Sequence, residues 1–351
     1  MSSGERASCS ASAFSRAGLA RVAIGCALTL LAACASDTKR EQPSLAGFIW
    51  PMKGVIAEGV AFDPVTRDFF VSSVRERRIW RVTPDGEFHD FAGPDMRLLG
   101  AFGLTIDSGR RVLWVASSRV PQSTGFGSRP AVAASVIGFD LRDGDVGFES
   151  ILQSEGEHVL GDVAVGPDGS VWATDSRTPG LYRWELHREP DLEFAGGLQR
   201  VPWGDDWRNP QGLAFSERGE LFVADYPRGI ARVDTVAGSH ALLKGSEERL
   251  RGVDGLYWHD GALYAIQNGT QTHRVLRIAL DATRTAVERI DILLEGPPLD
   301  DPTLGVFADG AFFVNAASGW GDYTETGERA NRPGRPLTEH RVVRIELEGR
   351  R

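Results

Sequence analysis

The feature that most constrains the fold of this 351-residue chain is a two-strand unit that recurs six times. Its clearest copy runs from Pro210 to Tyr226 and reads PQGLAFSERGELFVADY. An alternating apolar segment at residues 213–215 leads through a turn at residues 217–219 into a second apolar segment at residues 221–224. Neither segment can bury its apolar face alone, so the unit is stable only when several copies pack against one another.

The other five copies follow at intervals of roughly 45–60 residues, a spacing typical of propeller blades. They are GVAFDPVTRDFFVSS at Gly59, GLTIDSGRRVLWVAS at Gly103, DVAVGPDGSVWATDS at Asp162, GLYWHDGALYAIQNG at Gly255 and LGVFADGAFFVNAAS at Leu304. Each copy precedes a third alternating segment with Asp or Gly turn residues, a pattern typical of antiparallel hairpins. The repeats therefore predict an all-β fold, a six-bladed β-propeller.

A fourth strand follows in the first five repeats, for example at residues 87–93 and 287–296. The sixth repeat reaches Arg351 without one. We expect the segment Phe48–Met52 to supply the missing strand, because pairing the two ends of the chain closes the ring and leaves no open sheet edge. The propeller is predicted to span residues 47–351.

The N-terminal segment belongs to a different class of sequence. Arg16 and Arg21 precede an apolar run at residues 22–33, which is too short to span a bilayer. The run ends in Leu-Ala-Ala-Cys34, which resembles the lipobox of bacterial lipoproteins. This pattern predicts a signal peptide at residues 1–33, then a lipidated Cys34 and a polar tether at residues 34–46. An ordinary secretory signal and a start codon placed too early are the alternatives.

The predicted lipoprotein is exported to the periplasmic side of the cell envelope. Position 35 is Ala rather than Asp, which favours the outer over the inner membrane. The three cysteines are Cys9, Cys26 and Cys34, so the propeller has no disulfide, thiol nucleophile or cysteine metal site.

The net charge of −9 and the lack of a basic run argue against nucleic acid as a partner. We expect a monomer that binds a small-molecule substrate or an envelope ligand and reaches the membrane only through its lipid anchor. The seven histidines have no His-x-x-x-His spacing, so a zinc site is not predicted. Only His158 is expected near the candidate site, as a surface-loop residue.

Side chains with oxygen atoms recur at the start of the first predicted strand of several repeats. By strand count these positions converge on the central axis at one face of the ring, called here the top face. Converging carboxylates repel one another and are costly to desolvate unless a cation neutralises them, and a hard divalent ion such as calcium takes oxygen ligands. The candidate metal ligands are Glu58, Asp162, Gln211 and Asp254, with Asn268 and Asn315 as further candidates. Alternatively, acidic residues beside Gly cap tight turns by accepting hydrogen bonds from backbone N–H groups.

Three long loops are expected at the same face, at residues 117–135, 199–210 and 316–339. Long loops at one face commonly build a binding site, and aromatic side chains stack on flat or sugar-like ligands. The predicted substrate-binding residues are Trp203, Trp207, Trp320 and Tyr323. The alternative is that these rings fill the mouth of the propeller or pack the loops.

Several motifs resemble those of a known family. The stretches EGVAFDP from Glu58, VDGL from Val253 and PQGLAF from Pro210 resemble the gluconolactonase and senescence-marker-protein family of calcium-type propellers. The stretch DVAVGPDG from Asp162 is also similar to strictosidine-synthase-like and NHL-type propellers. The resemblance implies Glu58 and Asp254 as metal ligands. Gln211 replaces the family's Asn ligand, and Gly161 replaces an Asn beside Asp162.

The activity that this resemblance implies is the metal-assisted hydrolysis of a lactone or similar cyclic ester. Asp254 would be the catalytic residue, the general base that activates water. The alternative is a non-catalytic propeller that binds a carbohydrate, peptide or envelope protein through its top face, in which any metal is structural.

Overall fold

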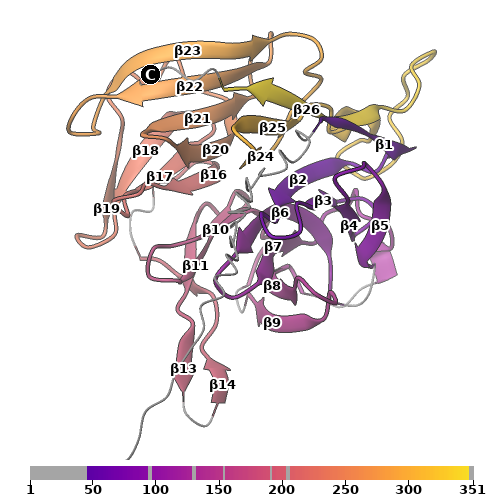
Figure 1. Cartoon of the computed structure of the whole chain (residues 1–351), viewed down its shortest axis with the longest axis horizontal. Coiled ribbons are helices and arrows are strands. Elements are labelled where there is room, and N and C mark those ends of the chain that lie inside the picture. The colour runs from indigo at the N-terminus through magenta and orange to yellow at the C-terminus, as the bar shows by residue number, and fades with distance from the viewer. Residues whose placement is uncertain are drawn as a thin grey trace, which may run out of the picture. The chain divides into compact units, whose positions relative to one another are not determined.

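The computed structural model describes residues 46–93, 97–128, 132–152, 155–189, 192–202 and 206–347. The predicted signal peptide, Cys34 and Trp203 lie outside these residues. The compact unit Ser44–Arg351 is an all-β ring of six four-stranded antiparallel sheets, which confirms the predicted propeller (Figure 1). Across the described ranges, no helix is both long and apolar enough to cross a membrane.

Each blade is numbered from its innermost strand outward. Blade 1 contains β2 (Ala57–Phe62), β3 (Phe69–Ser73), β4 (Arg78–Val82) and β5 (Phe88–Ala92). Blade 2 contains β6 (Gly100–Asp107), β7 (Val112–Ser118), β8 (Ala134–Asp140) and β9 (Val146–Ile151). Blade 3 contains β10 (Leu160–Val165), β11 (Val171–Asp175), β12 (Gly180–Trp184) and β15 (Gln199–Arg200).

The remaining blades follow the same order. Blade 4 contains β16 (Pro210–Phe215), β17 (Leu221–Asp225), β18 (Gly229–Asp234) and β19 (Ser239–Leu242). Blade 5 contains β20 (Val253–His259), β21 (Ala262–Gln267), β22 (Arg274–Leu280) and β23 (Val287–Glu295). Blade 6 contains β24 (Gly305–Ala308), β25 (Ala311–Asn315), β26 (Glu339–Glu346) and β1 (Phe48–Lys53). Short 3-10 helices are η1 (Phe126–Ser128) and η2 (Trp320–Asp322).

The ring closes as predicted, because β1 pairs antiparallel with β26. Side chains of β1 also reach the neighbouring blade 1. The ring of Trp50 meets that of Trp80 edge-on at 5.6 Å, and Phe48 lies 5.4 Å from Phe69. The first described strand therefore completes the last blade and packs on the first.

Every second strand is buried along its whole length, from β3 in blade 1 to β25 in blade 6. A strand in the middle of a propeller blade is covered by a neighbouring blade on each face, so most of its side chains are apolar or small, and buried polar residues such as Asp175 and Gln267 stand at the strand ends. The core of this molecule is consequently a series of layers between blades, and not a single central cluster.

Blade 3 departs from the expected pattern. A separate hairpin of β13 (His187–Glu189) and β14 (Leu192–Ala195) projects from the ring between its third and fourth strands (Figure 1). The fourth strand, β15, is only two residues long. The loop expected over residues 199–210 therefore begins two residues later, because Gln199 and Arg200 pair with Arg183 and Tyr182 of β12.

Ion pairs link neighbouring blades at the turns opposite the top face. Arg111 of blade 2 makes two 2.6 Å hydrogen bonds to Asp63 of blade 1. Arg67 of blade 1 pairs with Asp309 of blade 6, and Arg284 of blade 5 pairs with Glu220 of blade 4. These contacts connect sheets that share no strand.

Candidate functional site

A recurring irregularity at the start of the first strands builds the site. In blades 1 to 5 the register between the first and second strands shifts near the top end, for example between Ala57 and Val60 and between Val253 and Leu256. A β-bulge adds an unpaired residue and re-aims the side chains beside it. The shifts include Glu58, Gln211 and Asp254, which leave the regular ladder and line a cavity.

Glycine follows each of these three residues because the first strands approach one another closely at the axis. A Cβ atom on Gly59 would lie 2.5 Å from the carbonyl oxygen of Phe102 in the next blade. A Cβ atom on Gly212 would lie 2.5 Å from the carbonyl oxygen of Asp254. Gly59 and Gly212 thus let the bulges of adjacent blades meet.

The cavity that results has a volume of about 630 Å³. Glu58, Gln211 and Asp254 line it, together with Trp320 of the loop in blade 6. The loop between β7 and β8 contributes further lining residues, including Arg119 and Phe126 of the 117–135 segment, and so do Tyr226 and Asn268. Two of the three long loops predicted at the top face therefore do border the candidate site.

Burial raises the pKa of Glu58 well above its ordinary value, and the negative charge of Asp254 adds to the effect. The indole N–H of Trp320 opposes this shift by donating a 2.9 Å hydrogen bond to Glu58 Oε2. Burial likewise raises the pKa of Asp254 to about 7, with the charge of Asp301 as the next cause. The two carboxylates are therefore expensive to ionise together.

A set of neutral donors orients Asp254. The amide of Asn268 donates a 2.7 Å hydrogen bond to Asp254 Oδ2 and a 3.0 Å bond to the carbonyl of Pro302. The hydroxyl of Tyr226 donates to Asn268 Oδ1 at 2.9 Å, which fixes the amide in this orientation. The chain Tyr226–Asn268–Asp254 comes from blades 4 and 5.

Oxygen atoms that can accept a cation remain available in the cavity. Within the described part of the chain, no donor is bonded to Glu58 Oε1 or Asp254 Oδ1. Gln211 donates through Nε2 to Asn209 Oδ1 at 2.5 Å, which leaves its own Oε1 as an acceptor. Two carboxylates and one amide fit the oxygen chemistry that calcium prefers. No three His, Cys, Asp or Glu side chains of the described ranges are grouped closely enough to hold a metal by themselves.

Two other candidate metal ligands, Asp162 and Asn315, do not line the cavity. Asp162 accepts backbone N–H bonds from Val163 at 2.9 Å and Leu213 at 3.4 Å, and burial raises its pKa to about 7. One donor is the neighbouring residue in β10 and the other lies in β16 of the next blade, so both carboxylate oxygens of Asp162 accept a backbone hydrogen bond. Asn315 donates to Thr303 Oγ1 at 2.9 Å, while its buried Oδ1 has no partner among the described residues.

The predicted aromatic residues separate into two groups. Trp320 lines the cavity, whereas Trp207 is buried and stacks on His240 with ring centroids 4.0 Å apart. The hydroxyl of Tyr323 donates to the carbonyl of Gly54 at 2.8 Å, and the guanidinium of Arg75 covers its ring. Trp207 and Tyr323 therefore pack loops, in line with the alternative interpretation.

Sequence reasoning missed two carboxylates near the cavity. Asp301 lies just before blade 6, where its charge helps raise the pKa of both Glu58 and Asp254. The Asp-Pro pair before the sixth repeat was the available signal. Asp175, at the end of β11, lies 2.5 Å from Nδ1 of His158.

The expectation that His158 is a surface-loop residue is wrong. It is 2% exposed, and it lines the cavity wall. Asp175 holds the segment before β10 through the backbone N–H of Val159 and the ring of His158, which explains why this histidine turns inward.

No protein-family model and no curated protein sequence matches the chain. Solved structures do match it. The PQQ-bound aldose sugar dehydrogenase of Streptomyces coelicolor has a TM-score of 0.54 at 16% identity, covering 87% of this chain and 99% of that chain. A gluconolactonase from Xanthomonas campestris has a TM-score of 0.53 at 18% identity, and the match covers 76% of this chain and 84% of that chain. A luciferin-regenerating enzyme has a TM-score of 0.56 at 14% identity, and the match covers 86% of this chain and 96% of that chain.

Similarity at this level of identity concerns the fold. The matched proteins carry out different reactions on one architecture, so the architecture alone does not assign an activity. The chain is a six-bladed β-propeller whose solved structural neighbours include gluconolactonases.

Proposed function

We propose that this protein is a metal-dependent hydrolase of a lactone or a similar cyclic ester, acting in the top-face cavity. The observation that carries the proposal is a pair of carboxylates in one cavity, the buried Glu58 and the half-buried Asp254, each with one oxygen held by a neutral donor. Glu58, Asp254 and Gln211 would hold a divalent cation, calcium by preference for oxygen ligands. When bound, such a cation polarises the carbonyl of the ester.

Asp254 is the proposed general base. Asn268 occupies Oδ2, so Oδ1 serves both roles, with one lone pair toward the cation and the other toward the proton of the attacking water. Burial raises the pKa of Asp254 to about 7 in the metal-free site, and a cation bound beside it would lower this pKa and favour the ionised base. The water oxygen bonds to the carbonyl carbon, the ring C–O bond breaks, and the proton ends on the departing ring oxygen. The product is a hydroxy acid.

The test is a thermal melt of the chelator-stripped protein, titrated with calcium, manganese and zinc, followed by a lactone panel. A cation at a hundred times its dissociation constant adds about 2.7 kcal/mol, which moves the midpoint by several degrees. We expect Asp254→Asn to lose both the shift and the turnover, while Asp140→Asn in an outer turn keeps both. No shift with any ion would contradict the metallohydrolase and favour a binding propeller.

The proposal places the protein outside the cytoplasm, anchored by lipid at Cys34. The support is the apolar run of residues 22–33 followed by Leu-Ala-Ala-Cys. We expect cells fed a labelled fatty acid to incorporate label into the wild-type protein and not into Cys34→Ser. Label in both, or in neither, would overturn the anchor without affecting the proposed hydrolysis.

A further inference from the structure

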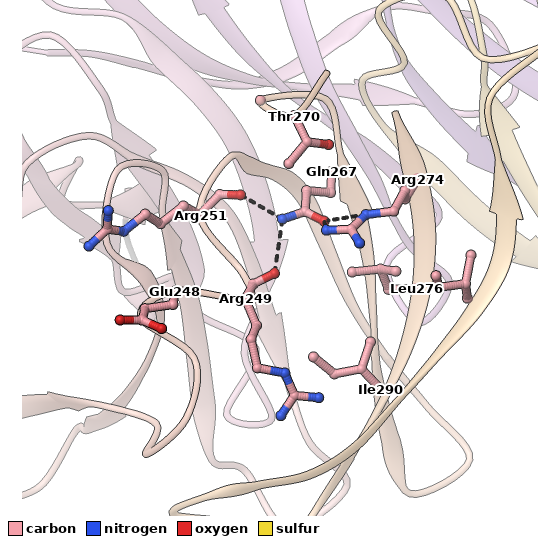
Figure 2. Close-up of a pocket in the computed structure, with 10 residues that line it drawn as sticks. Glu248, Arg249, Arg251, Gln267, Thr270, Arg274, Leu276 and Ile290 are labelled. Atoms are coloured by element: carbon pink, nitrogen blue, oxygen red, sulfur yellow. Dashed lines mark hydrogen bonds between the residues drawn. The ribbon is translucent and has the colours of Figure 1, made fainter. Parts of the chain in front are cut away.

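A second pocket lies beside blade 5 and shares no lining residue with the top-face cavity. Its volume is about 340 Å³. The walls come from the segment of residues 248–251 before β20, the loop after β21, and the outer strands β22 and β23 (Figure 2). This pocket plays no part in the proposed hydrolysis.

One buried side chain organises the pocket. Gln267, the last residue of β21, is 1% exposed. Its Nε2 donates to the carbonyl oxygens of Arg251 at 2.6 Å and Arg249 at 3.1 Å. Its Oε1 accepts from Nη2 of Arg274 at 2.6 Å and from Nε at 3.0 Å (Figure 2). All four bonds converge on one amide, so the floor of the pocket is fixed before any ligand arrives.

Two guanidinium groups line the pocket, that of Arg274 held by Gln267 and that of Arg249 exposed. In the part of the chain that the structure describes, the carboxylate of Glu248 lines it as well, without an ion pair to either. Within the described residues, neither Arg249 nor Arg274 forms an ion pair, although the chain has 48 acidic and 39 basic residues. Figure 2 shows the two guanidinium groups at different ends of the pocket, with Leu276 and Ile290 along the side between them, while the Arg251 side chain points away from Gln267. A fixed guanidinium is well suited to carboxylate and phosphate oxygens.

We infer that this pocket binds a small organic anion, a carboxylate or a phosphate ester. Its charged group pairs with Arg274, which Gln267 fixes, and with Arg249, whose exposed side chain turns toward the bound group from the other end of the pocket. Its carbon skeleton lies on Leu276 and Ile290, which give the pocket an apolar side. Gln267 does not contact the cavity, but the next residue, Asn268, orients Asp254 there. The two pockets are therefore adjacent along the chain.

Calorimetric titration with three probes tests this inference. The probes are phenyl phosphate, which has both features of the ligand, inorganic phosphate, which has only the charge, and phenol, which has only the ring. We expect phenyl phosphate to bind more tightly than inorganic phosphate, and phenol not to bind. Absence of phenyl phosphate binding at millimolar concentration would overturn the inference, and so would equal affinity for phenol.

Variants locate the binding. Arg249→Gln is the primary variant, because no described hydrogen bond involves its guanidinium and the fold does not depend on it. We expect it to weaken phenyl phosphate binding by about tenfold, which is about 1.4 kcal/mol. Arg274→Gln should weaken binding at least as much. The matched control is Arg218→Gln, an exposed arginine outside the pocket, and it should bind as the wild type does. Unchanged affinity in Arg249→Gln would place the anion elsewhere.

These measurements need no lactone and no added metal. The outcome therefore stands apart from the proposed hydrolysis: either can fail while the other holds.

Discussion

At the scale of single residues, the candidate site combines charge that opposes folding with donors that partly offset it. Burial raises the pKa of both Glu58 and Asp254, the charge of Asp254 raises that of Glu58 further, and the charge of Asp301 adds to both shifts. Trp320 and Asn268 each donate one hydrogen bond to this cluster. Such an arrangement reduces stability, and proteins retain it where a site needs it.

Glu58→Gln is therefore expected to stabilise the metal-free protein. A carboxyl group whose pKa is raised on folding destabilises the fold at any pH above its ordinary value, and the neutral amide removes that cost. At about pH 8 we expect the free energy of unfolding to rise by at least about 1 kcal/mol. Urea unfolding in the presence of a chelator measures this change in the free energy of unfolding. Glu325→Gln, an exposed glutamate on the cavity rim, should change it by less than about 0.5 kcal/mol. A loss of stability in Glu58→Gln would contradict this account of the cluster.

At the scale of elements, turns opposite the cavity hold neighbouring blades together. The carboxyl of Asp63 closes its own turn through Val65 and Thr66 and also accepts both hydrogen bonds from Arg111 of the next blade. Burial opposes the ionisation of Asp63, but these hydrogen bonds outweigh it and lower its pKa to about 2. The turn and the inter-blade contact therefore depend on one charge.

This ion pair predicts a specific acid sensitivity. Because the pKa is depressed in the folded state, the stabilisation is complete above the ordinary carboxyl value and is lost as the pH falls toward about 2. The ionised carboxyl of Asp63 contributes about 2 kcal/mol to the free energy of unfolding at neutral pH. We expect Arg111→Gln to lower the free energy of unfolding near neutral pH and to flatten its decline between about pH 5 and about pH 3. Denaturant unfolding across this range measures both effects.

Arg289→Gln is the control for the inter-blade pair. Arg289 pairs with Asp291 on an outer strand with its own side chain 57% exposed, and such surface pairs contribute about 0–1 kcal/mol. Its acid profile should match that of the wild type. If Arg111→Gln also gave the wild-type profile, the inter-blade pair would not contribute to stability.

At the scale of the whole molecule, closure of the ring depends on β1. This strand supplies the outer edge of blade 6, while its side chains join an apolar cluster that also contains residues of blade 1. Without it, β26 would present an unpaired edge, and the cluster around Trp80 would lose its cover.

Trp50→Ala tests the closure. Trp50 is 3% exposed and packs on Trp80 and Phe88 of blade 1. We expect a loss of about 3–5 kcal/mol in the free energy of unfolding, the usual cost of removing a buried aromatic side chain. Ile49→Ala, on the exposed face of the same strand, should cost less than about 1 kcal/mol. Thermal and denaturant unfolding compare the two. Equal, small losses would mean that β1 does not hold the ring closed.

The propeller, the number of its blades and the strand that closes it can all be predicted from the amino-acid sequence. These follow from a repeated alternation of apolar residues with turn residues, which is local information. The sequence also placed Glu58, Gln211 and Asp254 at one end of the ring, because strand count fixes the face on which each strand begins.

Which side chains come into contact depends on the folded molecule and could not be predicted from the sequence. Trp207 stacks on His240, and Asp162 accepts bonds from Leu213 of the next blade, although motif position and residue type had suggested site roles for both. His158 turned inward because Asp175, 17 positions away, accepts its hydrogen bond. The hairpin of β13 and β14 follows no repeat. Contacts between blades join residues far apart in the chain, and no local pattern records them.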